Sequence, residues 1–261
     1  MIVRKEPDGH TVLIAQTDHS RLVGQLAAHW GNSQFAAPRP FESVARAAAF
    51  HDFGWLRYET APYFDPETGG TPPFFRAPTN ERQLEAYRWC SEELLADDPY
   101  AGLIVSMHRT GLWRGRYGAL EHPPHAIPAR LPAQIEEFIA ESESRQEVER
   151  EKYGAAAIWT NYQLLQVWDQ LGLYFTCQDP YPQHIEPVPP DYGGEKFGGV
   201  RMTMKPVSAT RVEFAPYPFD TRPLPIQFTR RRLPAGRFAD DAQFRRAYFQ
   251  APLELVEFEL V

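Results

Sequence analysis

The chain has 261 residues, of which 43% are hydrophobic and 23% charged, so it can bury a substantial core and is not a disordered protein. Its 27 basic and 34 acidic residues give a formal net charge of -7, which disfavours a nucleic-acid polymer as the main partner because a negative field repels a polyanion. The two cysteines, Cys90 and Cys177, lie in apolar segments and indicate buried thiols instead of a disulfide framework.

The distribution of apolar residues indicates a cytoplasmic protein. Residues 1–10 are rich in charged side chains and lack the apolar core of a signal peptide. No stretch approaches the roughly 18 apolar residues of a membrane helix, so we expect no membrane partner. A homo-oligomer stays open, because residues 228–249 are rich in Arg, Tyr and Phe, which suit an interface.

The N-terminal segment predicts a β-hairpin followed by a helix. Residues 1–16 contain two short apolar runs on either side of the turn-forming triplet Pro7-Asp8-Gly9, which predicts two paired strands. In residues 17–30, apolar side chains recur at helical spacing. We expect a helix there, with His19 in its first turn.

Five further helices are expected before residue 176. The first is alanine-rich, spans residues 41–52, and ends with His51 and Asp52. A Pro- and Gly-rich irregular connection follows over residues 57–79. The other helices are expected over residues 80–96, 100–113, 132–153 and 155–175. The helix over 100–113 contains His108, and the mostly apolar last helix contains Asp169.

Beyond Cys177 the sequence becomes rich in Pro and Gly, with short runs that predict strands. These runs lie at residues 200–204, 211–214, 226–229 and 253–260. Because a lone hairpin is only marginally stable in water, we expect them to complete one small sheet with the N-terminal strands. The predicted fold class is therefore mainly α, with a helical core over residues 17–176. Residues 1–16 and 177–261 would form a small β-sheet appendage packed on that core.

Asp169 is the most informative single residue, because it lies in an apolar helix where an unpaired carboxylate is costly to bury. An arginine or a helix N-terminus could be its partner, but other candidates exist. His51 and Asp52 end a second core helix, and His19 opens a third. Imidazole and carboxylate together suit manganese, iron, nickel, cobalt or zinc better than calcium.

The order His19, His51-Asp52, Asp169 resembles the pattern of the HD superfamily of metal-dependent phosphohydrolases. That pattern is a histidine, an adjacent His-Asp pair and a distant aspartate on successive helices. The resemblance covers residues 17–175 and includes a Leu-Gly-Leu-Tyr run shortly after Asp169. It implies an HD-type helical bundle that holds a divalent metal with two imidazoles and two carboxylates and leaves positions for water and a phosphate. Within the superfamily, the segments around these residues are most similar to a bacterial family with no assigned function.

The resemblance also implies further roles. Some HD relatives bind a second metal through histidines on intervening helices, and His108 is the candidate here, the alternative being a hydrogen-bonded core histidine. Asp52 would both bind the metal and help to deprotonate water. Independently of the resemblance, a phosphate site needs cations for its developing charge, and Arg57, Arg109, Arg114 and Arg116 are candidates; the alternative is that they are solvated surface residues. The predicted catalytic residues are Asp52, His108 and Arg109.

Aromatic residues gather around the irregular connection that follows His51 and Asp52. They are Trp55, Tyr58, Tyr63, Phe64, Phe74 and Phe75. They either wall a pocket for a base or another flat group, or pin the loop to the core. His122 and His125 could add ligands, but loop histidines beside prolines are more often surface residues.

Together these residues predict a metal-dependent hydrolase that acts on a small phosphorylated molecule, such as a nucleotide, with one or two divalent transition-metal ions. Two alternatives stay open: an HD-fold di-iron oxygenase, and a non-catalytic protein that binds or senses a metal. The sequence has no Gly-rich phosphate loop, nucleophile elbow or paired Cys-x-x-Cys motif that would favour another class.

Overall fold

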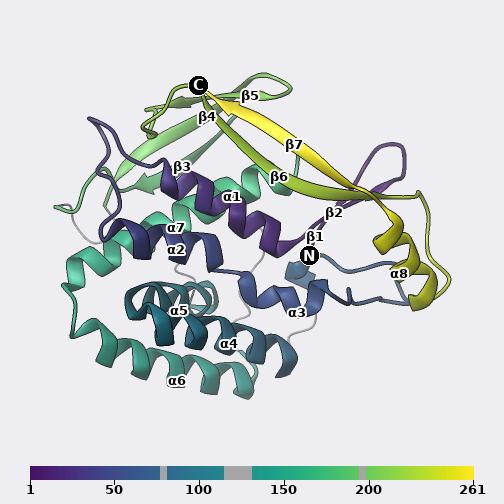
Figure 1. The fold of residues 1–261 in the computed structure, drawn as a ribbon, viewed down its shortest axis with the longest axis horizontal. Coiled ribbons are helices and arrows are strands. Elements are labelled where there is room, and N and C mark those ends of the chain that lie inside the picture. Colours follow the sequence, from purple (N-terminus) through teal and green to yellow (C-terminus); the bar gives the residue numbers. More distant parts are fainter. Residues whose placement is uncertain (77–80, 115–130, 194–197) are drawn as a thin grey trace.

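A seven-stranded sheet joins the N-terminal hairpin to the C-terminal third of the chain in the computed structural model, which describes residues 1–76, 81–114, 131–193 and 198–261 (Figure 1). The strands are β1 (Ile2–Lys5), β2 (Thr11–Ile14), β3 (Gln183–Val188), β4 (Val200–Ser208), β5 (Arg211–Ala215), β6 (Leu224–Leu233) and β7 (Leu253–Leu260). Their order is β1-β2-β6-β7-β5-β4-β3. The neighbours are antiparallel except β5 and β7, which run parallel.

The helices lie mostly between the two groups of strands in the sequence. They are α1 (Gln16–Ala28), α2 (Phe41–Phe50), α3 (Leu56–Glu59), α4 (Glu81–Asp97), α5 (Pro99–Trp113), α6 (Ala133–Arg150), α7 (Ala155–Thr176) and α8 (Asp241–Gln250). Of two short 3-10 helices, η1 (Phe53–Trp55) precedes the irregular connection over residues 57–79 and η2 (Phe74–Arg76) lies within it. In Figure 1, α1, α2 and α7 lie between the sheet and a layer formed by α4, α5 and α6. No helix in the described part of the chain is long and apolar enough to cross a membrane.

The prediction of a mainly α protein, an HD-type bundle with a small β appendage, is wrong. The structure is mixed α/β, and its sheet extends across seven strands. The pairing that builds this sheet is long-range: β2 pairs with β6, and Thr11 lies opposite Leu233. The N-terminal hairpin is therefore one end of a large sheet that also takes in a strand, β3, for which no run was predicted.

The sheet and the helices share one hydrophobic core. Trp168 of α7 packs edge to face on Trp30, with ring centroids 5.8 Å apart, and Trp30 packs in the same way on Phe219 at 5.6 Å. Phe175, also on α7, lies 5.1 Å from Phe258 of β7. Aromatic pairs of this kind add to the free energy gained by burying their area. They fix α7, which carries Asp169, against the strands.

Small residues let α1 approach α2 closely. A Cβ atom on Gly24 would lie 2.7 Å from the Cβ of Ala49, closer than atoms of real side chains approach. The alanine-rich sequence of α2 thus serves its packing against α1. Because of this close contact, the rings of His19 and His51 lie side by side, with centroids 5.4 Å apart.

Candidate metal centre

Five ionisable side chains converge inside the helical layer. His19 comes from the first turn of α1, His51 and Asp52 from the end of α2, His108 from α5 and Asp169 from α7. Each of the five is at most 7% exposed. Charged groups are almost never buried this deeply unless they are paired or bind a metal, so the cluster has to satisfy itself or hold an ion.

The ligand atoms lie at distances that one metal ion can bridge. His19 Nε2 is 2.8 Å from Asp169 Oδ1, and His51 Nε2 is 3.4 Å from the same oxygen. His51 Nε2 also lies 3.9 Å from Asp52 Oδ2, and His108 Nε2 lies 3.4 Å from Asp52 Oδ1. Atoms bound to one ion at about 2.1 Å lie about 3 to 4 Å from one another. Three of these side chains at a time, His51 with His19 and Asp169 or His51 with Asp52 and His108, lie close enough to surround one ion.

His51 has one ring nitrogen fixed by the backbone and the other directed at the carboxylates. Its Nδ1 donates a hydrogen bond to the carbonyl oxygen of Ala48 at 2.8 Å. Its buried Nε2 makes no hydrogen bond within the part of the chain that the structure describes. A bond from one ring nitrogen to a backbone carbonyl is typical of histidines that bind metals through the other.

The carboxylates and His51 shift one another's protonation. Burial alone would lower the pKa of His51, but Asp169 and Asp52 outweigh it and raise that pKa from 6.5 to about 9. Burial would raise the pKa of both aspartates, but the imidazoles outweigh it: contacts with His108 and His51 hold the pKa of Asp52 below its ordinary value, and contacts with His19 and His51 do the same for Asp169. Both aspartates are ionised at neutral pH, as metal binding requires.

The cluster contains two triads that could each hold a metal ion: His19, His51 and Asp169, and His51, Asp52 and His108. Both triads need His51, and only its Nε2 is available because Nδ1 bonds to Ala48. One ring nitrogen binds one ion, so the two triads cannot both be filled as they stand. The arrangement favours a single ion near His51, with Asp52 between that ion and His108.

Two residues on α1 support the site and were not predicted from the sequence. The side-chain amide of Gln16 donates to Asp52 Oδ2 at 3.2 Å. The backbone N–H of Asp52 donates to Ser20 Oγ, also at 3.2 Å. Gln16 and Ser20 are three residues before and one after His19, which places all three on one face of the helix. This spacing relative to His19 is the sequence feature from which Gln16 and Ser20 could have been predicted.

Gly172 makes room for the His19 ring. A Cβ atom at this position would lie 2.6 Å from His19 Cε1 and 2.7 Å from a methyl group of Val23. The glycine of the Leu-Gly-Leu-Tyr run after Asp169 thus has a steric reason: only glycine allows α7 to lie this close to the His19 ring.

The Gly172→Ala variant is expected to lose about 1–3 kcal/mol of unfolding free energy, because the added methyl group overpacks a buried contact. It is also expected to bind metal more weakly, since His19 has to move. Urea unfolding and a metal titration measure the two effects. Gly154→Ala at the start of the same helix is the matched control, because a Cβ atom there meets no atom within 4 Å. Equal metal affinity in both variants would contradict the steric role.

The predicted arginines differ in their positions. Arg114 pairs with Glu143 at 3.0 Å and with Glu136 at 3.6 Å, and Arg57 stacks over Trp89 at 5.2 Å. Arg109 instead lines a small cavity together with His51. Arg116, His122 and His125 lie outside the described residues.

Arg109 is held by aromatic rings. Its guanidinium carbon lies 3.9 Å from the ring centre of Trp113 and 4.5 Å from that of Tyr87. None of the described carboxylates lies within ion-pair distance of it, and within the same residues its Nε has no hydrogen-bond partner. A cation held by ring stacking keeps its N–H groups available for an anion.

A family model described as a protein of unknown function (DUF3891) matches residues 1–235. No curated protein and no solved structure matches the chain. The match assigns no activity and adds no link to the HD superfamily.

Proposed function

The chain belongs to the family of unknown function DUF3891, and we propose that it is a metal-dependent hydrolase of small phosphate esters. The observation that carries the proposal is the buried convergence of three imidazoles and two carboxylates from four different segments. In this proposal His19, His51, Asp52 and Asp169 hold one divalent ion. Their mixed nitrogen and oxygen donors suit manganese, iron, cobalt, nickel or zinc.

Such an ion would act as a Lewis acid and lower the pKa of a bound water. Side chains of the protein would carry out the proton transfers. Asp52 Oδ2 faces His51 and receives a hydrogen bond from Gln16, while Oδ1 faces His108 at 3.4 Å. In this arrangement His108 orients Asp52 and exchanges a proton with Oδ1 of the Asp52 carboxylate. The two residues would therefore act as a pair.

Arg109 supports an anionic substrate. It follows His108 directly on α5 and lines the same cavity as His51. A guanidinium without a carboxylate partner can bind two phosphate oxygens at once and stabilise charge as the ester bond breaks.

The protein loaded with manganese, iron(II), cobalt, nickel or zinc is expected to hydrolyse p-nitrophenyl phosphate or bis(p-nitrophenyl) phosphate, and chelation is expected to abolish the activity. Arg109→Gln is expected to lower kcat/KM by at least about tenfold, because it removes a donor to the phosphate, while the metal content stays unchanged. Release of p-nitrophenol and elemental analysis measure the two quantities.

Arg88→Gln is the matched control, since Arg88 also stacks on an aromatic ring, Phe138, but is paired with Glu141 at 2.9 Å. Metal binding without hydrolysis of either ester by any of the ions would refute the hydrolase and leave a metal-binding protein. Two equivalents of iron with oxygen consumption would point to an oxygenase instead.

A further inference from the structure

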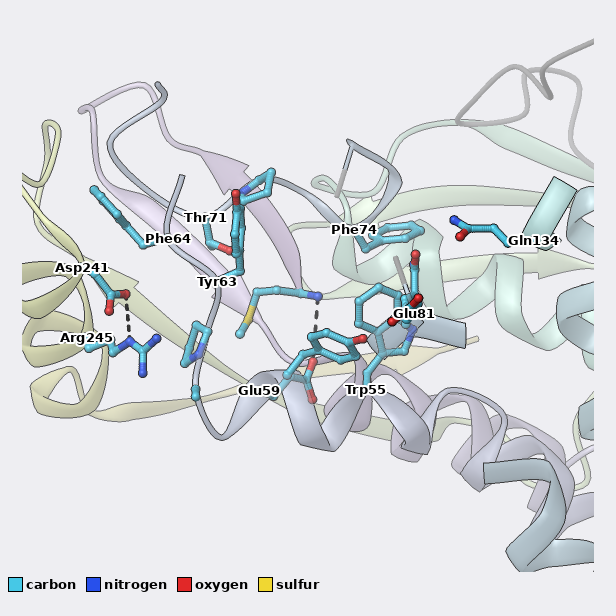
Figure 2. A pocket seen from close by; sticks show the side chains of 16 residues that line it. Trp55, Glu59, Tyr63, Phe64, Thr71, Phe74, Glu81, Gln134, Asp241 and Arg245 are labelled. Carbon is cyan, nitrogen blue, oxygen red and sulfur yellow. Dashed lines mark hydrogen bonds and ion pairs between the residues drawn. The ribbon is translucent and has the colours of Figure 1, made fainter. Parts of the chain in front are cut away.

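A second cavity, of about 750 Å³, is lined mostly by residues of the connection that follows Asp52 (Figure 2). Its volume is within the range of about 300–1,000 Å³ that is usual for small-molecule sites. Five aromatic side chains line it: Trp55, Tyr58, Tyr63, Phe64 and Phe74. The sequence left two interpretations open for these loop aromatics, and both apply: they wall a pocket, and Trp55, Tyr58 and Phe74 also pack in a hydrophobic core cluster. Phe75 is not among them.

The charged groups of this cavity are mostly acidic. Its lining includes the carboxylates of Glu59, Glu81 and Asp241, the guanidinium of Arg245 and the amino group of Met1, whose pKa is lowered by burial. Figure 2 shows Phe74, Glu81 and Gln134 at one end of the cavity and Asp241 with Arg245 at the other. An anionic ligand would meet net repulsion here, whereas a cation would be attracted.

Two of the three carboxylates are already engaged within the protein. Asp241 Oδ1 accepts a hydrogen bond from Arg245 at 2.8 Å. Glu59 accepts hydrogen bonds from the backbone and hydroxyl group of Thr17, and it forms an ion pair with the amino group of Met1 at 3.9 Å. Glu81, by contrast, forms no hydrogen bond or ion pair with any other described residue. It is the carboxylate that a ligand can use.

Proteins recognise alkylammonium groups through the faces of aromatic rings together with a carboxylate that is available to the ligand. The ring faces attract a cation, most strongly when the cation is shielded from water, and the carboxylate adds a direct charge interaction. We propose that this cavity binds a small organic cation of the quaternary or tertiary ammonium class, with its charged nitrogen between the aromatic rings and Glu81. The proposal depends on the cavity alone and does not require the hydrolase activity.

The test compares choline with 3,3-dimethylbutan-1-ol, a neutral molecule of the same shape, by calorimetric titration of the full chain. Choline is expected to bind at least about tenfold more tightly, because only it carries the charge that the rings attract. Equal affinities, or no binding of choline, would overturn the proposal, since the cavity would then be merely apolar or would not bind cations.

Two surface variants locate the binding. Glu81→Gln is expected to weaken choline binding about fivefold without changing the affinity for the neutral alcohol. Glu85→Gln is its matched control, because Glu85 is exposed on the same helix and does not line the cavity. Tyr63→Ala removes a ring that is 51% exposed, so the fold is preserved while choline affinity is expected to fall. Unchanged affinity in both Glu81→Gln and Tyr63→Ala would place the binding elsewhere and refute the site.

Discussion

The Asp169→Asn variant is expected to lose stoichiometric metal binding, with an affinity at least about a hundredfold below that of the unmodified protein. Asp169 Oδ1 is the atom that both His19 and His51 face, at 2.8 and 3.4 Å. An amide of the same shape fills the same space but lacks the negative charge that an ion needs. Elemental analysis after metal loading and desalting, with calorimetric titration, measures the loss.

A matched control is available on the protein surface. His29 Nδ1 and Asp220 Oδ1 form a pair at a similar distance, 2.9 Å, but both side chains are about half exposed. Asp220→Asn is therefore expected to retain full metal binding. Loss of metal in Asp169→Asn but not in Asp220→Asn assigns the ion to the buried cluster. If Asp169→Asn retained one equivalent at the original affinity, the proposed ligand set would be wrong.

Metal affinity is expected to rise about tenfold for each pH unit up to about pH 9 and then to level off, as the proton on His51 ceases to compete. The physical reason is the competition between a proton and the ion for His51 Nε2. The neighbouring aspartates raise the pKa of this ring to about 9, so below that pH the metal-free ring carries a proton that the ion has to displace. Calorimetric titrations in buffers of different ionisation enthalpy would report release of about one proton per ion near pH 7.

The unfolding free energy of the metal-free protein is expected to fall as the pH rises, opposite to the metal affinity, and this serves as a control. A raised pKa in the folded state stabilises the fold fully below the ordinary value of 6.5, and this stabilisation disappears as the pH rises through about 9. The loss is on the order of 3 kcal/mol. Urea unfolding after chelation, at pH 6 and at pH 9.5, measures it. Metal affinity that does not change between pH 6 and 9 would show that His51 is not a ligand.

The helices and the clustering of the ionisable residues could be predicted because their signals are local. Apolar spacing located α1, α2 and α4 to α7 within a few residues of their ends. Ionisable residues in apolar helices are costly to bury, which singled out Asp169 and its partners before any contact was known. The structure brings His19, His51, Asp52 and Asp169 together with His108.

The sheet could not be predicted in the same way, because strand pairing is a property of distant residues. The short runs in the C-terminal third indicated strands but not that β6 lies between β2 and β7. The sequence patterns did not predict helix α8, although Asp240 caps it by accepting a hydrogen bond from the backbone N–H of Gln243. Phe244 and Tyr248 bury its inner face at a spacing of four, a signal that the many charged residues around them obscured.

The position of β2 also affects the order in which the chain can fold during translation. Thr11 pairs with Leu233, so the hairpin leaves the ribosome about 220 residues before its neighbouring strand does. At about 5–20 residues per second this delay is about 10 to 45 s. Throughout it the nascent chain carries an open strand edge, which is prone to pair with other chains and calls for chaperone protection. All five residues of the ionisable cluster, from His19 to Asp169, precede β6, so they are synthesised before the sheet beside them can be completed.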